Sequence, residues 1–271
     1  MKYTIWFLFF TPYREKEGSN VKTKGNFTGK ADVYAKYRPS YPNEYIDYLF
    51  SANQLKGDQI VADIGSGSGI FSRQLLERGL NVIGVEPNDE MRMVAVQSLK
   101  QYPRFQSIKA TAENTALKGN SVDLVTVAQA FHWFDKKAFK IECLRILKQR
   151  ANVALVWNSR DLTSPIIKEN AAICQKTCSD FNGFSGGMEE TPEVFNNFFK
   201  DGKYEFKMYQ SDLVFDYEGF LGRNLSASYA PKKNDKEYKR FIFLLSELFE
   251  KYSKNEKIVL QNITRSYLGN V

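Results

Sequence analysis

Three glycines stand at alternate positions directly after an apolar run, in the segment VADIGSGSGIF at residues 61–71. Gly65, Gly67 and Gly69 would let the backbone turn tightly and come close to a bound molecule, because glycine has no Cβ atom. A dinucleotide-binding turn has the spacing G-x-G-x-x-G, and its third glycine lets the following helix pack against the strand. Ile70 stands where that third glycine belongs. The spacing therefore disfavours a dinucleotide, although a glycine run alone could also be a simple strand-to-helix turn.

Glu86 stands 17 positions beyond Gly69, at the end of the apolar run NVIGVE. A carboxylate at the carboxyl tip of a strand, beside a glycine turn, can accept hydrogen bonds from both hydroxyls of a ribose, and it would repel a phosphate. Glu86 could instead be an acid that caps the following helix, but Asn88 already supplies an N-cap side chain there. Glu86 therefore favours a ligand whose ribose hydroxyls are free.

His132 is the single histidine of the chain and lies in the segment AQAFHWFD, residues 128–135. An imidazole changes its charge near neutral pH, so His132 could be a general base for a hydroxyl or amine, or a hydrogen-bond donor to a substrate carboxylate. It could equally be a structural histidine. Arg223, Ser226 and Tyr229 are the best candidates for holding a carboxylate, although they could equally connect the C-terminal helices to one another.

The segments around these residues alternate between short β-branched runs and helical patterns from residue 59 onward. Strands and helices that alternate at this spacing form right-handed crossovers and a parallel sheet covered on both faces. We therefore expect an α/β fold with a doubly wound, mostly parallel sheet, whose carboxyl edge binds the ligand. The expected strands are residues 59–64, 81–86, 105–110, 122–128 and 152–158, and the expected helices begin near Asn43 and cover residues 70–79, 88–102 (N-cap Asn88) and 135–149 (N-cap Asp135).

This alternation ends at residue 162. We expect residues 162–200 and 217–254 to form a mostly helical cover over the carboxyl edge of the sheet. Helical patterns lie at residues 164–181, 191–199 and 235–254, and strand-like patterns lie at residues 203–215 and 256–268.

The composition excludes several classes of protein. The net charge of +7 would permit a polyanionic partner, but basic and acidic residues are interleaved, as in PKKNDKEYKR at residues 231–240. That pattern is typical of a solvated helix face, so we expect no nucleic-acid partner. Cys143, Cys174 and Cys178, with one histidine, do not make a zinc site, and we expect no metal and reduced thiols in a cytoplasmic protein.

The apolar opening MKYTIWFLFF is too short to span a bilayer, and no small-residue cleavage pattern follows it. We expect residues 1–30 to be a loosely ordered extension and expect no association with a membrane.

The glycine turn, Glu86, the segment ATAENTAL (110–117) and the segment AQAFHWFD follow in an order that resembles the class I S-adenosylmethionine-dependent methyltransferases. More narrowly, YRPSYP (37–42) and RNLSASYAP (223–231) are similar to the small-molecule branch that includes trans-aconitate methyltransferases. The resemblance covers nearly the whole chain and implies a Rossmann-like, seven-stranded sheet. One departure is KQRAN (148–152), where such families usually carry a Pro-Gly-Gly turn before the fifth strand. We expect no loss of cofactor binding, because that turn lies far from the ligand edge.

The resemblance also implies how S-adenosylmethionine is held. Glu86 would hold the ribose and Asp63 would orient the amino group. Arg38 would neutralise the carboxylate of the cofactor, or would instead form a surface salt bridge. The other implied residues are Gly65, Ser66 and Gly67 at the methionyl part, Gln129 and Ala130 beside it, Pro87 and Met91 on the adenine, Ala112 and Glu113 near its edge, and Tyr34 in an N-terminal lid.

The resemblance implies a methyltransferase that acts on a small molecule, which could be a carboxylate. Phe131 and Trp133, with Phe134, would form an aromatic wall that attracts the sulfonium, or a hydrophobic plug under the lid. Methylation of RNA or protein, and cofactor binding without turnover, remain open alternatives. We expect a cofactor-binding core at residues 31–160, a substrate cover with the last strands of the sheet at residues 161–271, and a monomer or weak homodimer.

Overall fold

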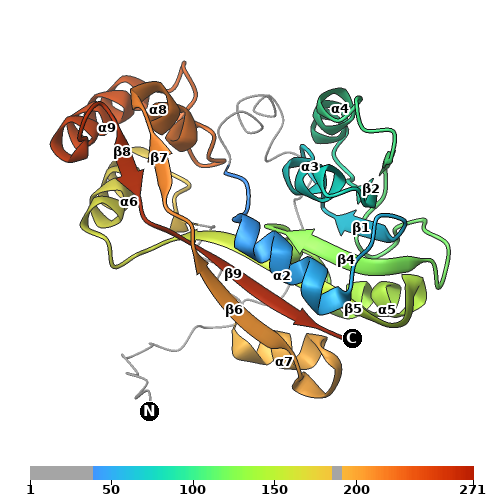
Figure 1. Cartoon of the computed structure of the whole chain (residues 1–271). Coiled ribbons are helices and arrows are strands. Elements are labelled where there is room, and N and C mark those ends of the chain that lie inside the picture. Colours follow the sequence, from blue (N-terminus) through green and yellow to red (C-terminus); the bar gives the residue numbers. More distant parts are fainter. Residues whose placement is uncertain (1–38, 185–190) are drawn as a thin grey trace, which may run out of the picture.

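The computed structural model describes residues 39–184 and 191–271 of the chain (Figure 1). Its centre is a seven-stranded sheet in the order β3-β2-β1-β4-β5-β9-β6. The first five strands pair in parallel, and β9 runs antiparallel between β5 and β6. The predicted doubly wound, mostly parallel, seven-stranded sheet is confirmed. Its strands are β1 (Ile60–Ile64), β2 (Asn81–Val85), β3 (Phe105–Ile108), β4 (Val122–Ala128), β5 (Leu147–Arg160), β6 (Glu205–Gln210) and β9 (Asn262–Gly269).

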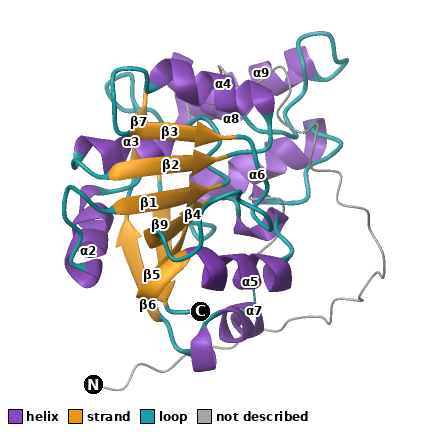
Figure 2. Ribbon diagram, turned by 90° about the vertical axis from the view of Figure 1, so that its right-hand side faces the viewer, coloured by secondary structure: helices purple, strands orange, loops and turns teal. Residues whose placement is uncertain are grey.

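Helices cover both faces of the sheet (Figure 2). On one face, Tyr45 of α2 belongs to the same buried cluster as Leu124 of β4. On the opposite face, Phe139 of α5 and Phe198 of α7 belong to a cluster with Val125 of β4. The central strand β4 is apolar on both faces because both are covered. These helices are α2 (Asn43–Asn53), α3 (Ile70–Glu77), α4 (Asp89–Ser98), α5 (Lys136–Ile146) and α7 (Pro192–Phe198).

Two predicted N-caps fix the beginnings of helices at the carboxyl edge. The Asn88 side chain accepts a hydrogen bond from the Met91 amide (3.0 Å) at the start of α4. The Asp135 carboxylate accepts hydrogen bonds from the Lys137 and Ala138 amides (3.0 and 3.1 Å) at the start of α5. Such caps satisfy amides that have no acceptor within the helix. The loop after β2 therefore ends at Asn88, and the loop after β4 ends at Asp135.

The segment KQRAN belongs to β5 and is not a turn in front of it. Helix α5 ends at Ile146 and β5 begins at Leu147, so the predicted helix at residues 135–149 is too long and the predicted strand at residues 152–158 is too short. The register between β4 and β5 shifts at this point, and Arg150 is left-handed (φ 64°). A bulge therefore takes up the residues for which the sequence pattern suggested a turn.

A cover with its own core stands beside the carboxyl edge (Figure 1). Its apolar cluster includes Phe220, Phe241 and Leu245. Helix α7 is not part of this cover, because Phe195 and Phe198 are buried in the cluster under the sheet. The prediction that all of residues 162–200 cover the carboxyl edge is therefore wrong for α7. The cover consists of α6 (Pro165–Thr177), α8 (Tyr217–Leu225), α9 (Tyr238–Tyr252) and the antiparallel ribbon of β7 (Leu213–Phe215) and β8 (Ile258–Leu260).

The two strand patterns near the C-terminus are each divided between the sheet and the cover. The pattern at residues 203–215 forms β6 and β7, and the pattern at residues 256–268 forms β8 and β9. At the crossing point the Asn262 side-chain amide donates to the Ser211 hydroxyl (2.8 Å). These two crossings join the cover to the sheet.

Candidate functional site

The glycine turn after β1 has a backbone that side chains other than glycine would strain. Gly65, Gly67 and Gly69 have φ values of +69°, +55° and +80°. A Cβ atom on Gly65 would lie 2.6 Å from the Cβ atom of Ala130. The amides of Gly65 and Ser66 donate to the Val85 carbonyl at the end of β2 (2.8 and 3.2 Å). The turn is therefore packed against the loop after β4 and hydrogen-bonded to β2.

Glu86 connects the glycine turn to the start of α4. Its carboxylate accepts hydrogen bonds from the Gly67 amide (2.9 Å) and the Asn88 amide (2.8 Å). Burial raises the pKa of Glu86, and the two amides act in the opposite direction. Each carboxylate oxygen has a further lone pair, so Glu86 can also accept hydrogen bonds from a ligand. Glu86 therefore contacts the start of α4, as one interpretation of the sequence proposed, and its role in binding a ligand stays a prediction.

Asp63 lies behind the glycine turn. It is fully buried, and its oxygens accept hydrogen bonds from the hydroxyls of Ser72 (2.6 Å) and Thr126 (3.1 Å). Burial raises its pKa to about 6, and the two hydroxyls oppose this shift. The sequence predicts that Asp63 orients an amino group of the ligand. The structure places Asp63 under the turn instead, where it holds α3 and β4 to β1.

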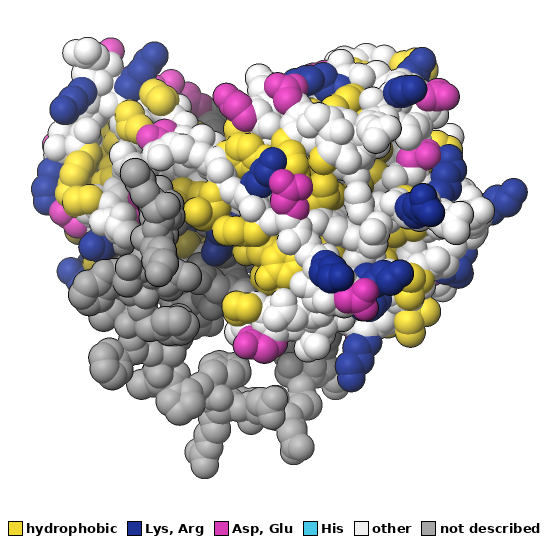
Figure 3. Space-filling view, turned by 60° about the horizontal axis from the view of Figure 1, so that its bottom comes forward, with side chains coloured by type: hydrophobic (Ala, Val, Ile, Leu, Met, Phe, Trp, Pro, Cys, Tyr) yellow, Lys and Arg dark blue, Asp and Glu magenta, His cyan; other side chains and the backbone are white. Residues whose placement is uncertain are grey.

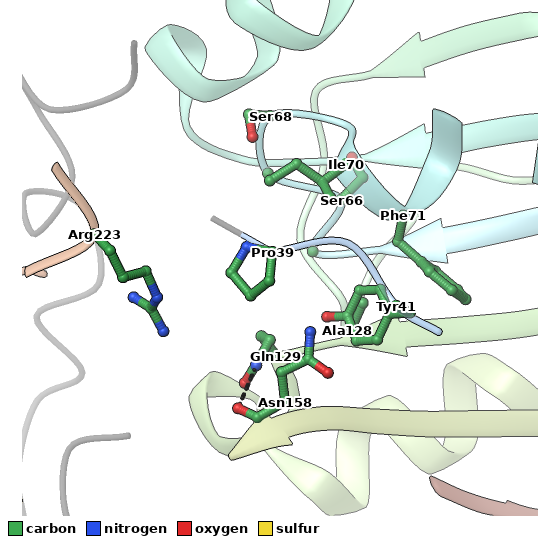
Figure 4. Close-up of a pocket in the computed structure, with 12 residues that line it drawn as sticks. Pro39, Tyr41, Ser66, Ser68, Ile70, Phe71, Ala128, Gln129, Asn158 and Arg223 are labelled. Carbon is green, nitrogen blue, oxygen red and sulfur yellow. Dashed lines mark hydrogen bonds between the residues drawn. The ribbon is translucent and has the colours of Figure 1, made fainter. Parts of the chain in front are cut away.

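The turn opens onto a pocket at the carboxyl edge (Figure 4). Arg223 points into it from α8, and Pro39 and Gln129 lie across from that side chain. The pocket thus brings together residues from the sheet, the cover and the segment in front of α2. The lining residues are Pro39, Tyr41, Gly65, Ser66, Gly67, Ser68, Ile70, Phe71, Ala128, Gln129, Asn158 and Arg223.

Asn158 is a pocket residue that the sequence analysis missed. Its side chain donates to the Ser40 carbonyl (3.1 Å) and accepts from the Thr264 hydroxyl (2.5 Å), and its carbonyl accepts from the Gln129 side chain (2.8 Å). Gln129 is left-handed (φ 61°), a conformation that only a well-fixed loop maintains. A polar residue at the carboxyl end of a predicted strand was the signal that could have identified Asn158.

None of the residues implied for the adenine lines this pocket, and Met91 lies against the turn. Met91 is buried, and its Cε atom is 3.4 Å from the position of a Cβ atom on Gly67. Ala112 is buried in the core and Pro87 is exposed. Glu113 accepts a hydrogen bond from the Asp135 amide (3.0 Å).

The aromatic segment after β4 has one member in the core, Phe131, and three of intermediate exposure, His132, Trp133 and Phe134. Phe131 is fully buried, and its ring lies 4.8 Å from that of Phe198. The prediction that Phe131 contacts a substrate is therefore wrong. His132 and Trp133 are partly exposed with ring centroids 4.7 Å apart, and neither lines the pocket. Burial, with the nearby charge of Lys136, lowers the pKa of His132 to about 4, so its ring is neutral near pH 7.

Of the three residues proposed to hold a carboxylate, only Arg223 reaches the pocket. Ser226 is fully buried and its hydroxyl donates to the Arg223 carbonyl (2.8 Å). The partly exposed Tyr229 ring packs edge-on against Phe181, with the ring centroids 4.9 Å apart, at the edge of the core of the cover. Ser226 and Tyr229 therefore stabilise the cover and do not form part of the clamp.

The described residues contain no group of three or more His, Cys, Asp or Glu side chains that could hold a metal ion. Cys143, Cys174 and Cys178 are buried free thiols. Within residues 39–184 and 191–271, no helix has both the length and the apolar character needed to cross a membrane. Tyr34 and Arg38, the predicted lid residues, and the predicted extension at residues 1–30 lie outside the described residues.

Sequence comparison identifies relatives of the central part of the chain. Residues 62–155 match the model of a family described as a methyltransferase domain. An uncharacterised methyltransferase of Mycobacterium tuberculosis is 40% identical over 136 residues, which are 50% of this chain and 53% of that protein. The chain therefore spans about half the length of this relative.

Structure comparison identifies proteins of the same fold. A candidate methyltransferase from an antibiotic biosynthesis pathway of Anabaena variabilis matches with a TM-score of 0.59 and 21% identity, over 85% of this chain and 98% of that one. A phosphoethanolamine N-methyltransferase of Haemonchus contortus, in complex with phosphomonomethylethanolamine and S-adenosylhomocysteine, matches with a TM-score of 0.53 and 17% identity, over 90% of this chain and 58% of that one. At these identities the matches establish a shared fold.

Proposed function

We propose that the chain transfers a methyl group from S-adenosylmethionine to a small molecule, because residues 62–155 match a methyltransferase-domain model and the chain shares its fold with methyltransferases. The observation that carries the proposal is the pocket in which the glycine turn faces Arg223 of the cover, with Glu86 bound to that turn (Figure 4). A turn of this shape allows close backbone approach, and Glu86 provides acceptors for two hydroxyls.

The residues at the turn fit the cofactor. Ser68 lines the pocket, and its hydroxyl is buried without a hydrogen-bond partner among the described residues. A polar ligand would supply that partner, since buried polar groups are normally hydrogen-bonded. Bound S-adenosylmethionine supplies an activated methyl group on a sulfonium. We propose that Glu86 holds its ribose, that Pro87, Met91, Ala112 and Glu113 flank its adenine, and that Gly65, Ser66, Gly67, Gln129 and Ala130 surround its methionyl part, with Tyr34 and Arg38 at the lid.

The chain's own part in the reaction is to exclude water, align the acceptor and accept a proton where the acceptor has one to lose. His132 follows the strand that ends at Ala128, and its neutral ring can take that proton. Trp133 would face the acceptor. An ionised carboxylate would need no base and would need a cation instead, which Arg223 provides.

Two features support a small acceptor over RNA or protein. The helical cover stands beside the carboxyl edge (Figure 1), and Arg223 reaches into the pocket from it (Figure 4). Basic and acidic side chains are interspersed on the face shown in Figure 3, as they are in the sequence. The narrower resemblance to trans-aconitate methyltransferases, the cytoplasmic location and the monomer or weak homodimer remain predictions.

Calorimetric titration with S-adenosylhomocysteine and with NAD tests the choice of cofactor. We expect S-adenosylhomocysteine to bind and NAD to bind far more weakly, because Ile70 stands where a dinucleotide-binding turn has its third glycine. Tighter binding of NAD would contradict the proposal.

A further inference from the structure

Arg160 is a second arginine on the pocket side of the sheet, at the carboxyl end of β5. It lies two residues beyond Asn158, which lines the pocket. Alternate residues of a strand share one face and are about 6.6 Å apart, so Arg160 stands one step further along the strand, where β5 leads toward α6. Its guanidinium carbon is 3.8 Å from the centroid of the Phe184 ring. This contact holds the guanidinium in place at the base of the cover.

Asn170 lies on α6, the first helix after the end of β5. It is fully buried, and its side-chain oxygen accepts from the Cys174 thiol at 3.6 Å. Phe184, whose ring contacts the Arg160 guanidinium, packs against the apolar cluster of the cover that contains Cys174, so Arg160 and Asn170 both border this cluster. Arg160 therefore stands between the sheet and the helix that begins the cover.

Both side chains have a buried nitrogen that lacks an acceptor. Neither the Nη2 atom of Arg160 nor the Nδ2 atom of Asn170 has a hydrogen-bond partner among the described residues. A buried donor that stays unpaired costs free energy, and the cost is larger for a charged donor. Two unpaired donors, one of them cationic, suit a ligand that has oxygen acceptors and negative charge.

We infer that Arg160 and Asn170 form an anion-binding subsite for the methyl acceptor, between β5 and the cover. The acceptor is a small organic anion, and its carboxylate or phosphate group binds to the Arg160 guanidinium. Arg223 points into the pocket from α8, so the two arginines approach the acceptor from different elements. This assignment rests on the proposed methyltransferase function, and it replaces Ser226 and Tyr229 as partners of Arg223.

Thermal unfolding of the protein saturated with S-adenosylhomocysteine tests the subsite. Succinate and inorganic phosphate are the probes, and sodium chloride at equal ionic strength corrects for general salt effects. We expect one of these anions to raise the Tm saturably above the chloride value, and the anion that does so distinguishes a carboxylate from a phosphate. Arg160→Gln should weaken this anion binding by about 10- to 100-fold.

The matched control is Arg240→Gln, which removes an exposed arginine of α9 in the same cover. This variant should keep the response to the anion. Arg160→Lys keeps the charge but not the planar donors, and it should retain only part of the response. The shift caused by S-adenosylhomocysteine alone is measured first in every variant, as a check on folding and on the cofactor site.

The possible failures are distinguishable. No shift with S-adenosylhomocysteine in the wild-type protein would contradict the proposed function itself. A normal shift with S-adenosylhomocysteine, but no response to either anion or an equal response in Arg160→Gln, would overturn the subsite alone.

Discussion

Glu86→Ala is expected to weaken the binding of S-adenosylhomocysteine by roughly 10²- to 10⁴-fold. In the proposed binding mode the substitution removes two charge-assisted hydrogen bonds to the ribose, each of which contributes about 1.5–3 kcal/mol. Glu86 is 9% exposed and its carboxylate is already oriented by the Gly67 and Asn88 amides, so little ordering is needed when the ligand binds. Calorimetric titration of the variant and of the wild-type protein measures the effect.

Because Glu86 also accepts hydrogen bonds from two backbone amides, its role in stability must be measured separately. The free energy of unfolding should fall in Glu86→Ala and fall less in Glu86→Gln, whose side-chain oxygen can still accept one amide hydrogen bond. Glu77→Ala is the control, since Glu77 is an exposed acid of α3 that contacts the Tyr102 hydroxyl (3.2 Å) away from the pocket. A less stable Glu86→Ala protein with an unchanged dissociation constant would limit Glu86 to a structural role.

His132→Ala should slow methyl transfer by roughly 10²- to 10⁴-fold if the acceptor must lose a proton, with little change in the affinity for S-adenosylhomocysteine. His132→Asn, which keeps hydrogen-bonding atoms but cannot accept a proton, should be equally slow. Loss of an anchoring hydrogen bond would instead appear mainly in KM. A variant with normal rate constants and a lower Tm would identify His132 as structural and remove it from the catalytic residues.

The pH dependence gives an independent test of the environment of His132. Its pKa falls from 6.5 in the unfolded chain to about 4 in the folded protein, so the unfolded state binds more protons between these values. The contribution of His132 to stability should therefore decrease as the pH falls from about 6.5 toward 4. The pKa of Asp63 is raised to about 6, so the contribution of Asp63 to stability increases as the pH falls. Asp63 is present in both the wild-type protein and His132→Asn, so its contribution cancels when their stabilities are subtracted. An equal pH dependence in the two proteins would show that His132 is not desolvated.

The sequence predicted the parts of the fold that depend on local patterns. The strands from β1 to β5, the helices between them and the caps at Asn88 and Asp135 follow from apolar periodicity and from side chains that can accept amide hydrogen bonds. Contacts between distant segments were not predictable in this way. Whether α7 joins the cover or packs on α5 depends on which surface its phenylalanines meet, and the strand patterns near the C-terminus do not indicate that each strand divides between two sheets.

The sequence also predicted several residues of the site, but not how deeply each side chain is buried. The glycine turn, Ser66, Gln129 and Arg223 line one pocket, as the order of the motifs suggested. The depth of a side chain was harder to infer, because a strand pattern does not distinguish a residue that faces a ligand from one beneath the turn. The predicted positions of Asp63 and Phe131 differ from the structure for this reason. Asn158 and Arg160 were not identified from the sequence, because their contacts are with residues far away in the chain.

The transfer of a labelled methyl group tests the proposed function most directly. The wild-type protein is incubated with S-adenosylmethionine that carries a labelled methyl group and with a cell extract separated into small molecules, RNA and protein. We predict that label enters the small-molecule fraction and that Glu86→Ala greatly reduces this transfer. Label that enters only RNA or protein, or no transfer to any fraction by a protein that binds S-adenosylhomocysteine, would contradict the proposal.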